Sequence, residues 1–135
     1  MPKTGRQWVW APNKPSVVPV ALKEEVSAKG DKLVQEYIKP TYVEPPSKKP
    51  RFNYLVDAHT KWRGRYYYFI SKYANPRPNR LAPFFYVGFA RMEYAGDRRF
   101  NLAYFRHTGK WWQVNSNLSL REALDLIRKD SLFHP

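Results

Sequence analysis

The chain has 135 residues, which suits one domain with a single hydrophobic core, and the absence of cysteine excludes disulfides and thiolate metal sites. No apolar run approaches the roughly 18 residues of a membrane span, so the composition predicts a soluble cytoplasmic protein without a membrane partner. The formal charge of +13, from 24 Lys and Arg against 11 Asp and Glu, favours a polyanionic partner such as DNA or RNA.

Residues 1–19 are predicted to form a basic, proline-rich N-terminal arm. The arm contains four prolines, each of which removes a backbone donor and favours extended geometry. Trp8 and Trp10 are unusual in an irregular tail, because disordered segments are poor in aromatic residues. We expect the arm to dock on its own domain, on a second subunit or on a ligand, and residues 20–135 to form a single domain.

A helix is predicted over residues 20–38, because apolar residues recur there at three- and four-residue steps. Gly30 lies on or near the apolar stripe and costs about 1 kcal/mol relative to alanine inside a helix. That cost leaves open a division into two helices, the second capped by Asp31. Pro40 is expected to end the helical segment, and residues 40–50 to form an extended connection.

The apolar pattern changes to a period of two after this connection, which predicts β-strands. The predicted strands are residues 52–59, 65–73, 84–94, 99–106 and 110–114. Three of the four connections between them are short enough for hairpins, so the strands are expected to form an antiparallel meander. The longer connection around Pro76 and Pro78 is where the strand order is most free to change.

The last element is predicted to be a helix of about ten residues. Ser119 and Glu122 have the spacing of a capping box. Leu132 and Phe133 are expected to return to the core. The apolar face of this helix consists of Leu120, Ala123, Leu124 and Ile127. The predicted fold class is therefore α+β: an antiparallel meander of about five strands, with an N-terminal helix and a C-terminal helix packed on the sheet.

The second and third predicted strands carry apolar residues on both sides, as the alternation through residues 84–90 illustrates. One terminal helix cannot easily cover two apolar faces. Either the N-terminal helix covers the second face, or that face contacts a second subunit or a ligand. A homodimer formed through this face is one of these arrangements.

Most aromatic side chains are expected to pack rather than to bind. The side chains expected in the core are Phe69, Phe85, Phe89, Phe100, Leu102 and Tyr104. Rings flanked by bases at turns or strand ends are better placed to stack on nucleobases, and each such stack contributes about 1–3 kcal/mol. These rings are Trp62, Tyr67 and one of Trp111 and Trp112, of which Trp112 is assigned to the candidate site.

Basic residues of three hairpins are predicted to converge. If the strands follow one another in space, the first and last hairpins are expected to share one end of the sheet and to bind phosphates there. The candidate residues are Lys61, Arg63 and Arg65 at the first hairpin, Arg98 and Arg99 between the third and fourth strands, and Arg106, His107 and Lys110 at the last hairpin.

No metal site and no cofactor are predicted. The three histidines do not have the spacing of metal ligands, and neither a phosphate-binding loop nor a nucleophile motif occurs. One catalytic alternative is metal-independent RNA cleavage, which needs an acid, a base and cations for the phosphate. Arg106, His107 and Lys110 could supply them together with His59 or a tyrosine.

Short motifs occur between residues 33 and 133: AR-x-x-Y from Ala90, a W/F-x-L-x-Y/W strand from Phe100, R-x-x-G-x-W from Arg106, and L-x-x-x-L-x-x-I-x-x-D from Leu120, before Phe133. In these motifs, and in a helix followed by a hairpin of bases and aromatics, the chain resembles a family of small bacterial proteins known only as a domain of unknown function. The resemblance implies the same layout and brings no activity, catalytic residue or partner.

The sequence therefore predicts a nucleic-acid-binding protein for single-stranded DNA or RNA, which uses a basic and aromatic sheet surface and performs no catalysis. One alternative is a structural or assembly protein that dimerises through its aromatic sheet face. The other is the metal-independent ribonuclease.

Overall fold

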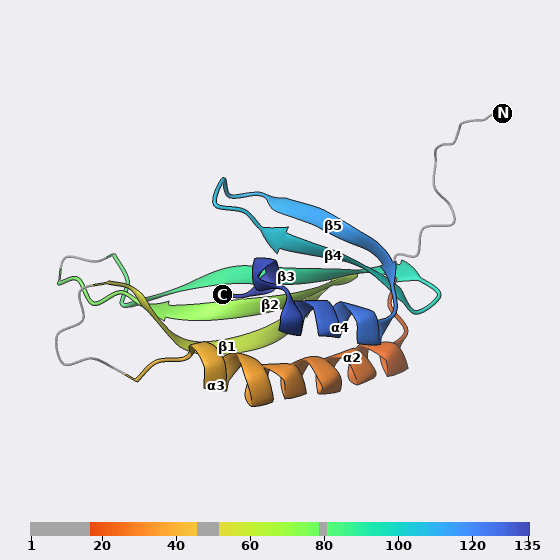
Figure 1. Ribbon diagram of the computed structural model, residues 1–135, viewed down its shortest axis with the longest axis horizontal. Coiled ribbons are helices and arrows are strands. Elements are labelled where there is room, and N and C mark those ends of the chain that lie inside the picture. The colour runs from red at the N-terminus through yellow and green to blue at the C-terminus, as the bar shows by residue number, and fades with distance from the viewer. Residues whose placement is uncertain (1–16, 46–51, 79–80) are drawn as a thin grey trace.

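The computed structural model describes residues 17–45, 52–78 and 81–135, in the arrangement that Figure 1 shows. Most of the predicted arm, residues 1–16, lies outside this part of the chain. The helical segments are α2 (Val20–Leu33), the π turn η1 (Val34–Ile38), α3 (Lys39–Tyr42), α4 (Leu120–Lys129) and the 3-10 turn η2 (Ser131–Phe133). The strands are β1 (Tyr54–Arg63), β2 (Tyr66–Ala74), β3 (Phe84–Gly96), β4 (Arg99–Phe105) and β5 (Trp111–Leu118).

The five strands form one antiparallel sheet in the order β1-β2-β3-β4-β5. Each strand therefore pairs only with its neighbours in the sequence, as short connections between antiparallel strands favour. The long connection between β2 and β3 does not alter this order. A helix precedes the sheet and another follows it, which confirms the predicted α+β fold.

The N-terminal helical segment buries a stripe with a spacing of four residues: Leu22, Val26, Gly30, Val34 and Ile38. On a helix with 3.6 residues per turn, such a stripe drifts by about 40° at each step. The π turn η1 rotates the stripe back, because its turns contain more residues. Its wider hydrogen bond joins the Lys39 amide to the Val34 carbonyl, five residues earlier. The whole stripe therefore faces the sheet.

The predicted ends of this helical segment were partly wrong. Helical structure continues without a break from Val20 to Tyr42, so Gly30 does not divide it and Asp31 caps no second helix. Instead, the Asp31 carboxylate accepts a hydrogen bond from the Thr60 hydroxyl of β1. Pro40 does not end the segment either, because it lies in the first turn of α3, where proline is tolerated.

The C-terminal helix α4 begins with the predicted capping box. The Ser119 hydroxyl accepts from the Glu122 amide at 3.1 Å, and the Glu122 carboxylate accepts from the Ser119 amide at 2.8 Å. After the helix, Phe133 is fully buried, as expected, but Leu132 is exposed. The turn η2 explains this difference, since two successive residues of a tight turn cannot both point into the core.

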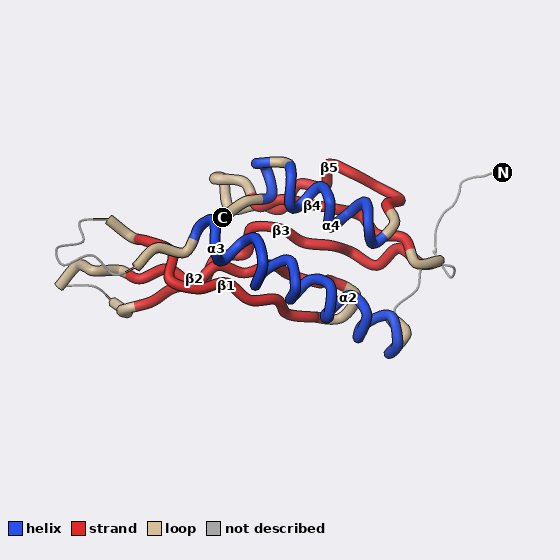
Figure 2. Tube along the Cα trace, turned by 60° about the horizontal axis from the view of Figure 1, so that its bottom comes forward, coloured by secondary structure: helices blue, strands red, loops and turns tan. Residues whose placement is uncertain are grey.

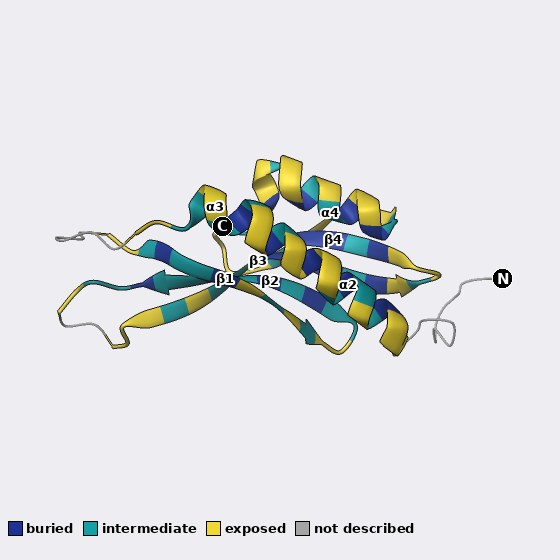
Figure 3. Ribbon diagram, turned by 90° about the horizontal axis from the view of Figure 1, so that it is seen from below, coloured by how far each residue is buried: buried dark blue, intermediate teal, exposed yellow. Residues whose placement is uncertain are grey.

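Both helices lie on the same face of the sheet. Figures 2 and 3 show α2 and α4 side by side across that face, with the buried residues between helices and strands. Most of the side chains that were expected in the core are buried there, including Phe69, Phe100 and Leu102, whereas Phe85 is half-buried and stacks on Tyr73. The second face of the sheet is therefore not covered by the N-terminal helix.

The three hairpins do not meet as predicted. In a consecutive meander, the β1-β2 and β3-β4 turns lie at one end of the sheet, and the β4-β5 turn lies toward the other (Figure 1). The prediction that the first and last hairpins share an end was wrong. The turns of a meander alternate between the two ends of the sheet. The first and third turns therefore share one end, and the fourth turn lies at the other.

Candidate nucleic-acid interface

The face of the sheet opposite the helices, called the open face here, carries aromatic and basic side chains. Alternation along each strand defines it: Tyr67 contacts α2, so Tyr66 and Tyr68 point away from the helices. Arg91 likewise lies between the core residues Ala90 and Met92. The open face comprises His59, Lys61 and Arg63 of β1, Tyr66, Tyr68, Ile70 and Lys72 of β2, Tyr86, Gly88, Arg91 and Glu93 of β3, Asn101, Ala103 and Phe105 of β4, and Trp111 and Gln113 of β5.

Arg91 lies near the middle of the open face, in contact with two aromatic rings. Its guanidinium carbon is 4.6 Å from the centroid of the Tyr66 ring and 4.9 Å from the centroid of the Trp111 ring. The Trp111 ring reaches across the face from β5 and meets the Tyr68 ring edge to face, with centroids 5.7 Å apart. Each cation–π contact contributes about 0.5–2 kcal/mol, depending on how far it is desolvated. Together these contacts hold both the guanidinium and the indole in place.

The missing side chain at Gly88 makes room for this arrangement. A Cβ atom on Gly88 would be 2.9 Å from Trp111 Cζ2, which is too short for a normal contact. The indole therefore lies directly against the backbone of β3. Phe105 packs edge to face on the same indole, with centroids 5.2 Å apart. The result is a continuous surface of rings across four strands.

Two rings of the open face present substantial area to solvent. Tyr86 is 60% exposed and Phe105 is 38% exposed, whereas Tyr66, Tyr68 and Trp111 are half-buried. His59 meets the Tyr86 ring edge on, with centroids 5.9 Å apart. Tyr86 and Phe105 are therefore the open-face rings most accessible to a planar ligand.

The positive charge is concentrated in the sheet. Residues 54–118 carry eleven bases and three acids, whereas the helical segments, residues 20–42 and 119–135, carry four of each and three of each. On the three central strands, β2, β3 and β4, Glu93 is the only acid. Its carboxylate is 2.9 Å from Arg65 Nε and also accepts from the Asn101 amide at 3.3 Å. The other cations of the open face thus have little competing negative charge.

Three of the predicted site residues lie on this face, and two predicted stacking rings do not. Lys61 and Arg63 are exposed on the open face, and Arg65 reaches it from the hairpin and is paired with Glu93. Tyr67 is completely buried under α2, and Trp62 donates from its indole nitrogen to the Ser27 hydroxyl of α2 at 3.1 Å. The prediction that Trp62 and Tyr67 stack on nucleobases was therefore wrong, because both point toward the helices.

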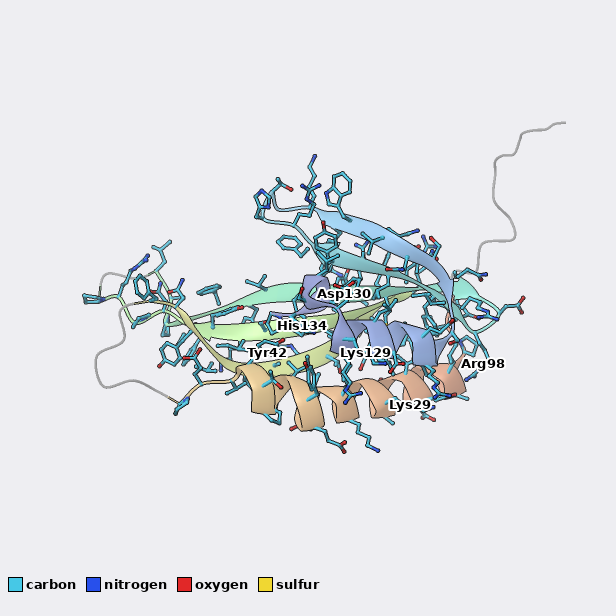
Figure 4. The ribbon with its side chains drawn as sticks, in the orientation of Figure 1. Lys29, Tyr42, Arg98, Lys129, Asp130 and His134 are labelled. Carbon is cyan, nitrogen blue, oxygen red and sulfur yellow. The ribbon has the colours of Figure 1, made fainter. Side chains whose placement is uncertain are left out.

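The predicted arginines of the β3-β4 hairpin attach the sheet to the helices. Arg98 donates to both carboxylate oxygens of Glu25, at 2.8 and 2.9 Å, and Figure 4 shows it beside α2. This hydrogen-bonded pair, helped by Lys29, lowers the pKa of Glu25. Arg99 lies 3.9 Å from the carboxylate of Glu122 in α4. Arg98 and Arg99 are thus paired with acids rather than presented on the open face.

The last hairpin forms a separate basic patch. The Arg106 guanidinium carbon is 4.4 Å from the Trp112 ring centroid, and Trp112 is 48% exposed. His107 and Lys110 are exposed in the same turn. This patch includes a ring and three bases as predicted, but it lies away from Arg63 and Arg98.

Residues 17–135 match the model of a family described as a domain of unknown function, DUF3024. The chain belongs to this family. No curated protein and no solved structure matches this DUF3024 chain. In the described part of the chain, no helix combines the length and the apolar character needed to cross a membrane.

Sequence reasoning missed the centre of the open face of this DUF3024 domain, namely Tyr66, Tyr68 and Arg91, and it assigned Trp112 rather than Trp111 to the site. One signal was present: Arg91 is a base flanked by apolar residues in the middle of a strand, as expected of a side chain on the face opposite the core. The contact between Trp111 and Gly88 was not predictable from alternation, since it joins strands that are not neighbours.

No cluster of potential metal ligands occurs within the described ranges. His59 contacts Tyr86 on the open face, whereas His134 contacts Tyr37 and Tyr42 on the helical side. These two histidines therefore lie in different parts of the molecule. A groove of about 330 Å³ between α2 and α4 is lined by helix residues of mixed charge, and another of about 420 Å³ is lined by residues of α2, of the β3-β4 hairpin and of the start of α4. Neither groove contains an open-face residue.

Proposed function

We propose that this DUF3024 domain binds single-stranded DNA or RNA on its open face and performs no catalysis. The observation that carries the proposal is the asymmetry of the two faces. Both helices cover one face of the sheet, while the other presents rings and bases from all five strands. Such a combination of a cationic surface and accessible rings is how sequence-tolerant proteins hold unpaired strands.

The distribution of charge supports a polyanion on this face. The helical layer has no net charge, so the excess of bases over acids belongs to the sheet, the arm and the connection after α3. Lys61 and Arg63 project from β1, and Lys72 lies further along the same face on β2. Each phosphate that they neutralise releases condensed counterions, which makes association favourable at low salt.

The rings support a single strand rather than a duplex. The bases of a duplex are stacked on each other, whereas unpaired bases can stack on protein rings. Tyr86 and Phe105 are accessible at two separate points of the open face. A strand that stacks on both rings would cross β3 and β4 and would place its phosphates near Arg91.

Fluorescence anisotropy with a labelled single-stranded oligonucleotide, over a series of salt concentrations, tests the proposal. We expect binding that weakens with salt, with a slope of about −0.7 in log affinity against log salt for each phosphate contact. A duplex of the same sequence is expected to bind more weakly. Absence of binding at low salt, or an affinity that does not change with salt, would refute the proposal.

A pair of matched variants locates the surface. Lys61→Gln with Arg63→Gln removes two positive charges from the open face, and Lys32→Gln with Arg121→Gln removes two exposed charges from the helices. Both pairs lower the net charge equally. Only the first pair is expected to reduce the salt slope, by about 1.4 if two phosphate contacts are lost. Equal effects of the two pairs would mean that the oligonucleotide is attracted by the net charge of the whole protein and not by the open face.

Self-association is a second candidate function, favoured by the edge strand β5. None of its eight residues, Trp111–Leu118, is charged, although the chain as a whole is strongly basic. Trp112 and Val114 are exposed on it, and an unpaired, uncharged edge can pair with another strand. Sedimentation equilibrium of the wild-type chain and of Val114→Lys tests this candidate. A monomer at all concentrations would exclude it.

A further inference from the structure

Arg91 is a partly buried cation without a carboxylate partner in the described residues. The neighbouring arginines of the sheet are paired: Arg65 with Glu93, Arg98 with Glu25, and Arg99 with Glu122. No ion pair joins Arg91 to any acid of the described chain, and its Nε is buried without a hydrogen-bond acceptor there. The structure thus leaves one positive charge at the centre of the open face uncompensated.

A partly buried positive charge without a partner destabilises the fold unless an anion binds to it. Taking a cation out of water is unfavourable, and a donor that is buried without an acceptor adds to the cost. The rings of Tyr66 and Trp111 offset part of it through cation–π attraction. Rings accept no conventional hydrogen bonds in the plane of the guanidinium, however, so the buried Nε–H of Arg91 still lacks an acceptor among the described residues.

The same packing prepares Arg91 for an oxyanion. The guanidinium is a planar fork of five donors whose geometry matches two oxygens of a phosphate. The contacts of the guanidinium with the rings of Tyr66 and Trp111 restrict the plane of the fork, so binding would cost little side-chain entropy. In the register of the sheet, Arg91 stands between Tyr68 and the small Ala103, and Lys61 lies beyond Tyr68 in the same row.

We infer that Arg91 is a phosphate-binding residue, which holds one phosphate group by its guanidinium fork while Tyr66 and Trp111 keep the fork in position. When that phosphate belongs to a nucleic-acid strand, the inference rests on the proposed function. It adds to that function a fixed point at which the backbone of the strand is held. A free phosphate ion offers the same oxygens and is the second source of the ligand.

The side-chain Nε–H signals of arginine in ¹⁵N-edited NMR spectra test the inference directly. The probes are inorganic phosphate, sodium chloride at equal ionic strength, a single-stranded oligonucleotide, and the same oligonucleotide with an uncharged methylphosphonate backbone. We expect the Arg91 signal, assigned through Arg91→Lys, to shift with phosphate and with the natural oligonucleotide. Chloride and the uncharged backbone are expected to leave it unchanged.

Affinity measurements on variants provide the second test. Arg91→Gln is expected to weaken oligonucleotide binding about tenfold or more, because a hydrogen-bonded charge pair is lost. Arg91→Lys keeps the charge without the fork, so it is expected to recover only part of the loss. Arg63→Gln, an exposed arginine of the same face, is the control, with an expected loss of only a fewfold. Thermal unfolding confirms that each variant is folded.

The outcomes separate this inference from the proposed function. If Arg91 shifts with inorganic phosphate and the oligonucleotide does not bind, the inference stands and the nucleic-acid proposal fails. If the oligonucleotide binds with a salt-dependent affinity while the Arg91 signal stays fixed and Arg91→Gln matches Arg63→Gln, the inference is wrong and the proposal stands. Full recovery of affinity in Arg91→Lys would likewise contradict the inference that the guanidinium fork binds the phosphate, since the positive charge alone would then be enough.

Discussion

Gly30 of α2 lies directly over the ring of Tyr67 of β2. A Cβ atom on Gly30 would stand 2.7 Å from Tyr67 Cε2, and closer still to the hydroxyl oxygen. The helix can approach the sheet at this point only because residue 30 has no side chain. The ring in turn is completely buried, and burial raises the pKa of its hydroxyl far above the ordinary value. The pair sets the distance between the helix layer and the sheet.

Gly30→Ala is therefore expected to destabilise the fold. Alanine gains about 1 kcal/mol in helix propensity, but forced packing of an extra methyl group typically costs about 1–3 kcal/mol. We expect the second effect to prevail, because the atoms in contact belong to a rigid, buried ring. Urea denaturation followed by circular dichroism measures the change. A more stable variant would show that α2 can move away from β2 at little cost.

Tyr67→Phe provides the companion measurement. The Tyr67 hydroxyl is buried without a hydrogen-bond partner among the described residues, so its removal is expected to be neutral or mildly stabilising. It also removes the oxygen nearest to residue 30. The double variant should therefore lose less stability than the sum of the two single changes. Strict additivity would mean that the two residues do not interact.

Gly88→Ala is expected to displace Trp111 from the open face. The added methyl group would be 2.9 Å from the nearest indole atom, so the ring would have to shift, and its contacts with Arg91 and Tyr68 would be weakened or lost. We expect a change in the near-ultraviolet circular dichroism of the rings and weaker oligonucleotide binding. The control is the same change in a Trp111→Phe background, where the smaller ring leaves room. An equal effect in both backgrounds would mean that alanine at position 88 disturbs strand β3 itself and does not act through Trp111.

Ser119→Ala is expected to destabilise the domain by about 1 kcal/mol, the usual contribution of an N-cap side chain. The Ser119 hydroxyl accepts from the Glu122 amide, and alanine leaves that donor without its partner. Ser119→Asp retains an acceptor at this position and is expected to recover most of the loss. Thermal unfolding of the three proteins provides the measurement. If aspartate is no better than alanine, the cap contributes nothing to stability.

The ion pair between Glu25 and Arg98 predicts a specific pH dependence. Because Arg98 lowers the pKa of Glu25 below its ordinary value of 4.5, the pair stabilises the fold above that pH and stops doing so as the pH falls through the lowered pKa. Wild type is expected to be more stable than Glu25→Gln at neutral pH, with the difference disappearing in acid. Glu24→Gln, at a neighbouring residue with no ion pair in the described structure, is the control. A difference that persists in strong acid would contradict the assignment.

The order of the strands was predictable from the sequence because short connections leave an antiparallel strand little choice of partner. Ser119 and Glu122 identified the start of α4 for a similar reason, since a capping box is a local motif. The extension of the N-terminal helical segment through Pro40 was not predictable. It depends on a π turn, which arises from the fit of a four-residue stripe against the sheet.

The candidate site was predicted less well than the fold. Exposed bases such as Lys61 and Arg63 are recognisable from the sequence, but the face on which a ring lies depends on strand register, and one position exchanges the faces. Tyr66, Tyr67 and Tyr68 show the difficulty, since three successive tyrosines carry no alternation to read. The pairing of Arg98 with Glu25, 73 residues away, lies beyond any local pattern.

The consecutive strand order also has a consequence for how the chain folds. The sheet can grow strand by strand from Tyr54 to Leu118, and each step pairs a strand with its neighbour in the sequence. The helix layer differs, because Tyr42 hydrogen-bonds to His134 across 92 positions, and Figure 4 shows the two side chains close together. A contact between residues so far apart in the sequence costs more chain entropy, so it is expected to form late in folding. We therefore expect the sheet, including its open face, to form first and the helices to dock on the opposite face afterwards.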